Sequence, residues 1–196
     1  MSGCSQDRRP INVPAADLLR LFQDAERRPL HGRFELKEHT FAGVPRASLV
    51  VPAESRVTWK LFVPHRGRLQ MFVAFAEASA ASVAVRVGVS DNRVYNTLAE
   101  RTISSAEAAR GWVALDVDLS TYAGRKWSLF YRPDGRKWQI IVGTHVLAGS
   151  VSNVYLGSPA LMTDVEGARE YLRRLTTTAP ASRASGASRA PWPRAS

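Results

Sequence analysis

A period of two runs through the middle of the chain and constrains its fold more than any other feature. Apolar and polar side chains alternate in short runs at residues 57–63, 69–75, 83–89, 113–119, 127–131 and 138–142. Such alternation is typical of strands with one face on a core and one towards solvent. Turn residues separate the runs, and no intervening helix is long enough for a parallel crossover. The pattern predicts an antiparallel β-sandwich over residues 40–162.

The segments before and after the predicted sandwich have helical spacing. In the lead of residues 1–39, the stretch Pro14–Glu26 predicts a short amphipathic helix, with an apolar stripe of Leu18, Leu19, Phe22 and Ala25. Residues 163–175 predict a second short helix, in which Thr163 and Glu166 have the spacing of a capping box. Residues 176–196 are rich in Ala, Ser, Pro and Arg, and this composition predicts a disordered tail.

Composition excludes several classes of protein. An apolar content of 45% is ordinary for a globular domain. The chain has no apolar run long enough to span a bilayer, and its single Cys4 excludes an internal disulfide or a Cys-based zinc site. No catalytic motif surrounds any of the 4 His, so we expect a non-enzyme with no catalytic residue.

The net charge of +10 consists of 23 Arg and 4 Lys against 17 acidic residues. An excess of Arg over Lys is what a GC-rich genome encodes on neutral surfaces, and the alternative is a surface selected to bind polyanions. Residues 125–137 alone carry a net +4. Nucleic acid ranks third among the possible partners, because no recognised nucleic-acid-binding motif accompanies this basic hairpin.

Two aspartates on one predicted strand are a weak candidate for a metal site. Asp116 and Asp118 project from the same face, and with backbone carbonyls they are able to bind Ca²⁺. The alternative is a solvated strand face on which Asp118 holds the following turn through a side-chain hydrogen bond. No other cofactor is expected.

Aromatic residues beside polar turns are the candidate ligand-binding residues. Trp59, Trp112 and Trp127 are in phase with the apolar faces of their strands, which predicts a place in the core. Trp138 directly follows the basic hairpin and is either a ligand-stacking residue or a core-edge residue. The predicted ligand-binding set is Asn92, Arg93, Tyr95, Arg136 and Trp138.

The segment Gly111–Arg125 reads G-W-V-A-L-D-V-D-L-S-T-Y-A-G-R. It resembles the W-x-x-x-x-V-D-L-S-x-Y-A-G segment of bacterial jelly-roll modules related to carbohydrate-binding and galactose-binding-like domains. The stretches Pro52–Pro64 and Leu156–Leu161 are similar to the entry and closing segments of the same modules, and the resemblance spans residues 14–162. One subgroup of these modules lies beside sulfatase-like, alkaline-phosphatase-superfamily domains in envelope proteins.

The resemblance implies a jelly-roll sandwich and a non-catalytic binding or accessory module for carbohydrate or anionic glycan at the bacterial envelope. No hydrolase domain follows in this sequence, so no catalytic residue carries over. The first alternative is a structural module that docks a sulfatase-like partner through an acidic protein surface. The second is binding of polyanion or nucleic acid through the basic hairpin and the tail.

The residues Ser2-Gly3-Cys4 resemble the end of a bacterial lipobox. If an apolar signal segment is encoded upstream, Cys4 is the mature, lipidated N-terminus, and the module is anchored at the envelope. The alternative is a cytoplasmic chain in which this tripeptide occurs by chance. An in-frame signal peptide upstream is the expected finding, and stop codons immediately upstream would exclude lipidation.

Overall fold

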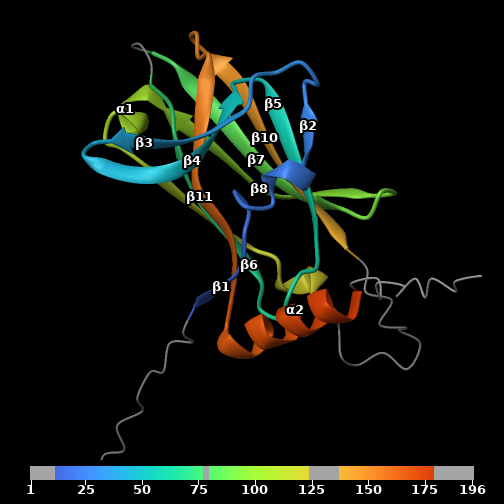
Figure 1. Ribbon diagram of the computed structural model, residues 1–196. Coiled ribbons are helices and arrows are strands. Elements are labelled where there is room, and N and C mark those ends of the chain that lie inside the picture. The colour runs from blue at the N-terminus through green and yellow to red at the C-terminus, as the bar shows by residue number, and fades with distance from the viewer. Residues whose placement is uncertain (1–11, 77–79, 124–136, 179–196) are drawn as a thin grey trace, which may run out of the picture.

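The alternating runs form two antiparallel sheets that pack face to face (Figure 1). The computed structural model describes residues 12–76, 80–123 and 137–178. One sheet, which we call the front sheet irrespective of the view in Figure 1, has the strand order β2-β5-β10-β7-β8. The back sheet has the order β3-β4-β11-β6-β9, and β1 pairs with the remaining length of β11. The predicted mainly-β, antiparallel sandwich is therefore confirmed.

The element bounds follow the sequence runs closely in the middle of the chain. The strands are β1 Val13–Asp17, β2 Glu26–Arg28, β3 Glu35–Phe41, β4 Val44–Pro52, β5 Ser55–Leu61, β6 Arg68–Ala74, β7 Ser82–Ser90, β8 Tyr95–Ser104, β9 Val113–Asp118, β10 Trp138–Ala148 and β11 Asn153–Thr163. The helices are α1 Ser105–Ala108 and α2 Val165–Thr178, with single 3₁₀ turns at Phe22–Asp24 and Ser120–Tyr122.

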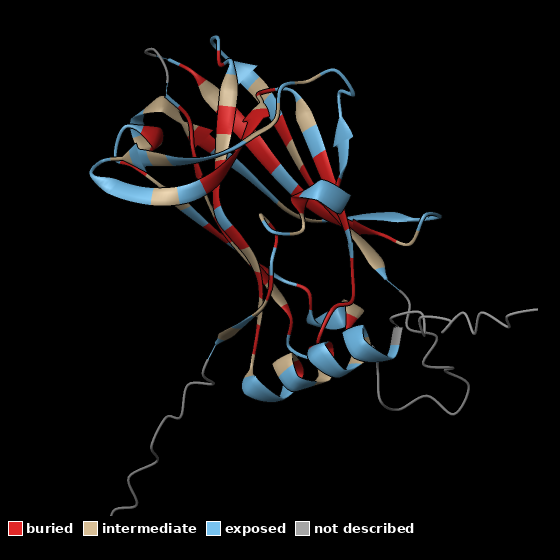
Figure 2. Cartoon of the chain, in the orientation of Figure 1, coloured by how far each residue is buried: buried red, intermediate tan, exposed pale blue. Residues whose placement is uncertain are grey.

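The core lies between the inner faces of the two sheets (Figure 2). Trp59 and Ile140 of the front sheet and Leu69 and Leu156 of the back sheet are all at most 1% exposed. Full burial of one large apolar side chain stabilises the fold by about 1.5–3 kcal/mol relative to exposure. The apolar positions of the alternating runs are thus the residues that face the core.

The predicted helix over Pro14–Glu26 is wrong. This segment forms β1, a 3₁₀ turn and β2, so it contributes a strand to each sheet. The backbone of β1 pairs with Ala160–Thr163 of β11, and Trp59 Nε1 donates a hydrogen bond to Leu18 O at 3.1 Å. A short isolated helix is marginal because its nucleation is costly, whereas a ready sheet edge satisfies the same backbone groups.

The predicted C-terminal helix is present, but its cap differs from the prediction. The Asp164 carboxylate accepts the Gly167 N–H at 2.8 Å, so Asp164 caps α2. The Thr163 hydroxyl instead donates to the backbone oxygen of His65 at 2.5 Å. Thr163 is still part of β11 and is fully buried, which directs its side chain away from the helix terminus.

Several predictions lie outside the described residues. They concern the strand at 127–131 with Trp127, the basic hairpin with Arg136, the tail from 179 onward, and Cys4. The first three residues of the predicted tail, 176–178, belong instead to the last turn of α2. Strands β1, β2, β3, β4, β8 and β11 lie outside the alternating runs recognised in the sequence.

Candidate ligand-binding groove

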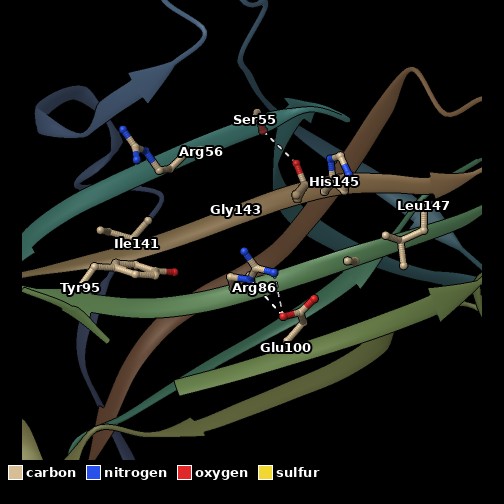
Figure 3. Close-up of a pocket in the computed structure, with 11 residues that line it drawn as sticks. Ser55, Arg56, Arg86, Tyr95, Glu100, Ile141, Gly143, His145 and Leu147 are labelled. Atoms are coloured by element: carbon tan, nitrogen blue, oxygen red, sulfur yellow. Dashed lines mark hydrogen bonds and ion pairs between the residues drawn. The ribbon is translucent and has the colours of Figure 1, made fainter. Parts of the chain in front are cut away.

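An open groove of about 440 Å³ crosses the outer face of the front sheet (Figure 3). Side chains from β5, β7, β8 and β10 line it, and its members are Ser55, Arg56, Ala84, Arg86, Tyr95, Glu100, Ile141, Gly143, Thr144, His145 and Leu147. The groove lies on the side of the sheet opposite to the core. Its size and openness suit an extended ligand that stays partly in water.

Strand register explains why the outer face is hollow here. Gly143 of β10 pairs with Arg56 of β5 on one side and with Arg86 of β7 on the other. The missing side chain at Gly143 leaves a low floor between two long cationic side chains, as Figure 3 shows. Two residues along β10, Ile141 pairs with Thr58 and with Gly88, and the Tyr95 ring covers Gly88.

Tyr95 supplies the aromatic surface of the groove. It begins β8 and is 44% exposed. Its ring packs on the sheet over Gly88. A Cβ at Gly88 would lie 2.4 Å from three atoms of the phenol. Glycine is therefore needed at position 88 for close approach, and one part of the Tyr95 ring remains open to the groove.

The charged groups around the groove are partly paired. Arg86 binds Glu100 through Nη2 at 2.9 Å and Nε at 3.1 Å, which holds both side chains along the wall. Within the described parts of the chain, Arg56 has neither an ion pair nor a side-chain hydrogen bond. The groove thus offers one fixed donor and acceptor pair and one cation able to bind an anion.

His145 lines the groove, and Glu54, which is not a lining residue, contacts it from outside. The His145 Nδ1 contacts a Glu54 carboxylate oxygen, and the other oxygen accepts the Val146 N–H at 2.7 Å. Desolvation opposes ionisation of Glu54, but the hydrogen bonds from Val146 and His145 outweigh it and lower the pKa of this carboxyl. The Glu54 carboxylate therefore holds the His145 side chain at the groove.

The predicted ligand-binding residues are divided between the two faces of the front sheet. Asn92 and Arg93 lie in the turn between β7 and β8, and Asn92 accepts a hydrogen bond from Gln139 Nε2 at 2.7 Å. Tyr95 is in the groove. Trp138 alternates with Gln139 and is packed inward against the core, where its ring meets Tyr122 edge-on at 5.1 Å. The Tyr95 and Trp138 rings therefore do not share a surface.

Asp116 and Asp118 are both occupied by protein donors. Asp116 accepts hydrogen bonds from Arg68 Nε at 2.8 Å and from Gln70 Nε2 at 3.1 Å. Asp118 accepts the Ser120 N–H at 2.8 Å, and this backbone hydrogen bond lowers the pKa of its carboxyl. These contacts match the solvated-face and turn-holding interpretation. Among the described residues, no cluster of three or more potential metal ligands occurs.

Sequence reasoning missed most of the groove. Arg56, Arg86 and Glu100 occupy outward positions on three strands, and only the strand order brings them together. The available signal was a glycine at an outward position in two neighbouring strands, Gly88 and Gly143. A strand glycine often marks a place where a ring, a ligand or another backbone approaches closely.

Comparison with known proteins gives alignments of low sequence identity to solved structures. No family model and no curated protein matches the sequence. Among solved structures, the CBM51-2 and INT domains of Clostridium perfringens ZmpB align at 11% identity and a TM-score of 0.49, over 72% of this chain and 30% of that one. The CBM22-1 xylan-binding domain of Paenibacillus barcinonensis Xyn10C aligns at 13% identity and a TM-score of 0.43, over 70% and 83%.

A third match is the CBM22-1 and GH10 modules of Clostridium thermocellum Xyn10B complexed with xylohexaose, at 10% identity and a TM-score of 0.44, over 73% of this chain and 26% of that one. The chain spans 14–30% of the length of the ZmpB structures that it matches.

In the described part of this chain, no helix is both long and apolar enough to cross a membrane.

Proposed function

We propose that this chain is a non-catalytic binding module that recognises carbohydrate, including anionic glycans, in the groove on the outer face of the front sheet. The observation that carries the proposal is the partly exposed Tyr95 ring, laid flat over Gly88 at the edge of an open groove with oriented polar walls. A sugar has an apolar C–H face and polar edges, and this groove offers a partner to each.

In this arrangement the sugar ring stacks on Tyr95, and its hydroxyl groups exchange hydrogen bonds with Arg86 and Glu100. The pair suits hydroxyl recognition because the guanidinium donates while the carboxylate accepts. Arg56, which has no described ion-pair partner, is the residue for a carboxylate or sulfate on the glycan. A place for the module at the bacterial envelope stays a prediction from the sequence around Cys4.

Titration of a panel of neutral and uronic-acid oligosaccharides tests the proposal, with calorimetry as the readout. We expect Tyr95→Ala to weaken binding about tenfold, because the stacking surface is removed. Tyr95→Phe keeps the ring and should retain most of the affinity. Val94→Ala is the matched control, because Val94 is the exposed neighbour and does not line the groove.

Absence of binding across the whole panel would overturn the proposal. So would a Tyr95→Ala protein that folds like the wild type and binds its best glycan with unchanged affinity. The thermal unfolding midpoint of each variant confirms that the sandwich is intact.

A further inference from the structure

The outer face of the back sheet carries a group of half-buried aromatic rings that the proposed groove does not use. The ring cluster consists of His39, Phe41, Phe72, Trp112 and Tyr155. Phe41 meets Trp112 at 4.9 Å and Tyr155 at 5.1 Å between ring centroids, and Tyr155 meets His39 at 4.4 Å. Phe41 packs edge-on against Trp112 and Tyr155, an arrangement that aromatic pairs favour, and the His39 ring is tilted against Tyr155.

A guanidinium lies within the ring cluster. The Arg46 Cζ is 3.4 Å from the centroid of the Phe72 ring. Gly157 makes room for it, because a Cβ there would lie 3.1 Å from Arg46 Cδ and 2.7 Å from the Trp112 ring. The Arg46 Nε is buried and has no hydrogen-bond partner among the described residues. Burial of an unsatisfied charged donor destabilises a protein unless an anion compensates it.

The acidic residues identified on the same face already have protein partners. Glu35 binds Arg33, Asp116 binds Arg68 and Gln70, and Asp118 accepts the Ser120 N–H. Within the described residues, no carboxylate lies within ion-pair distance of Arg46. The Arg46 charge therefore contacts the Phe72 ring but has no anionic partner among the described residues, and it is complementary to an anionic group.

The remaining side chains favour a small ligand over a docked protein. Among the described residues of the back-sheet strands, only Leu36 and Val44 are large exposed apolar side chains, at 47% and 46%. The centre of a protein interface is richer in desolvated apolar area than this. Half-exposed rings around one cation match the apolar face and the anionic substituent of a single sugar unit.

We propose that the ring cluster and Arg46 form a second binding site, which takes a sugar ring that carries a carboxylate or sulfate group. The anionic group pairs with the Arg46 guanidinium, and the sugar ring lies on the exposed parts of Trp112 and Tyr155. This site is on the opposite outer face from the groove, and it does not depend on the function proposed for the groove.

The Trp112 indole N–H, which donates to Val44 O at 2.8 Å, is a reporter beside the site. Its NMR resonance, assigned with Trp112→Phe, is followed during titration with trigalacturonate, inorganic sulfate and uncharged xylotriose at constant ionic strength. We expect saturable shifts with trigalacturonate and with sulfate, and much smaller shifts with xylotriose. A tighter response to trigalacturonate than to sulfate supports the sugar site, whereas a response to sulfate with none to trigalacturonate overturns it.

Arg46→Gln should weaken trigalacturonate binding about tenfold or more, because a charge-assisted hydrogen bond is lost. Arg46→Lys keeps the charge but lacks the planar guanidinium, so its affinity for trigalacturonate should lie between those of the wild type and Arg46→Gln. Arg68→Gln is the matched control, since it removes a cation of the same face that is already paired. Tyr95→Ala, which changes only the groove, should leave the Trp112 response intact.

Equal titration of wild-type and Arg46→Gln proteins would overturn the second site, as would equal losses in Arg46→Gln and Arg68→Gln. If Arg46→Gln does not fold, the wild-type titrations decide the matter, and a Trp112 resonance that trigalacturonate and sulfate leave unshifted overturns the site. If the Trp112 resonance does not respond but Tyr95→Ala still weakens glycan binding, the second site is overturned and the groove proposal stands.

Discussion

At the scale of single residues, glycine decides where an aromatic side chain can rest on a sheet. Gly88 lies under Tyr95 on the front sheet, and Gly157 lies under Trp112 on the back sheet. Each glycine faces outward, so its role is to admit a ring rather than to fill the core. Both candidate sites of the molecule are built on this contact.

Gly88→Ala tests the contact directly. The added methyl group meets the Tyr95 phenol at 2.4 Å and must displace the ring, so we expect destabilisation of about 1–3 kcal/mol and weaker glycan binding. Gly143→Ala is the matched control, because its Cβ meets only Ser55 O at 3.7 Å; its free energy of unfolding should stay within about 1 kcal/mol of wild type. Urea denaturation measures the free energy of unfolding of both variants. Equal destabilisation by Gly88→Ala and Gly143→Ala would contradict the role assigned to Gly88.

At the scale of elements, the terminal segments depend on the sandwich for their structure. Helix α2 has an apolar stripe, yet only Tyr171 of that stripe is fully packed, at 3% exposed. Leu172 and Leu175 are 59% and 44% exposed. Burial raises the pKa of the Tyr171 hydroxyl, as expected for a phenol removed from water. Tyr171 is therefore the main apolar contact between α2 and the core.

Tyr171→Ala should destabilise the protein by about 3 kcal/mol, the usual cost of deleting a buried aromatic ring. Amide hydrogen exchange along α2 should accelerate more than exchange in β10, because the helix loses its anchor first. Leu172→Ala, one residue along and exposed, should change stability by less than about 0.5 kcal/mol. If both substitutions leave the exchange of α2 unchanged, other contacts hold the helix.

At the scale of the whole molecule, the two sheets turn two different outer faces to solvent. The groove of the front sheet and the ring cluster of the back sheet lie on opposite sides of the core. A molecule with two sites can bind two segments of one glycan at the same time. The resulting avidity can exceed the affinity of either site alone. The net charge of +10 acts over the whole surface and favours anionic partners in general.

Salt dependence separates glycan recognition from general attraction to polyanions. The affinity for a neutral oligosaccharide should change less than about twofold between roughly 50 and 200 mM salt, because few counterions are released. A nucleic-acid binder with 6–10 phosphate contacts would lose about 10³–10⁵ in affinity over the same range. Calorimetric titration at both salt concentrations provides the measurement, and a steep loss with the neutral sugar would contradict groove binding through Tyr95.

The sequence predicted the parts of the fold that depend on local pattern. Alternation located β5, β6, β7, β9 and β10, and it placed Trp59 in the core. It failed for Pro14–Glu26, where apolar spacing also suited a helix and a free edge of β11 was available to pair with the chain. Trp112 was expected in the core but lies half-buried on the outer face, where Gly157 leaves room for its ring.

The candidate groove was predictable only in part, since Tyr95 was identified but its neighbours were not. Arg56, Arg86 and Glu100 come from separate strands and meet through cross-strand register. Trp138 follows the same alternation as Ile140, and the inward direction of that alternation separates it from Tyr95.

The sequence by itself determined the class of the molecule: an antiparallel sandwich, basic in charge, with alternating strands around one core. Only the tertiary structure decided which outward residues share a surface. Alternation with a period of two specifies the face of each residue within its own strand, while hydrogen-bonded strand order specifies its neighbours. The groove at Gly143 and the ring cluster at Arg46 both arise from strand order, because their members are far apart in the chain.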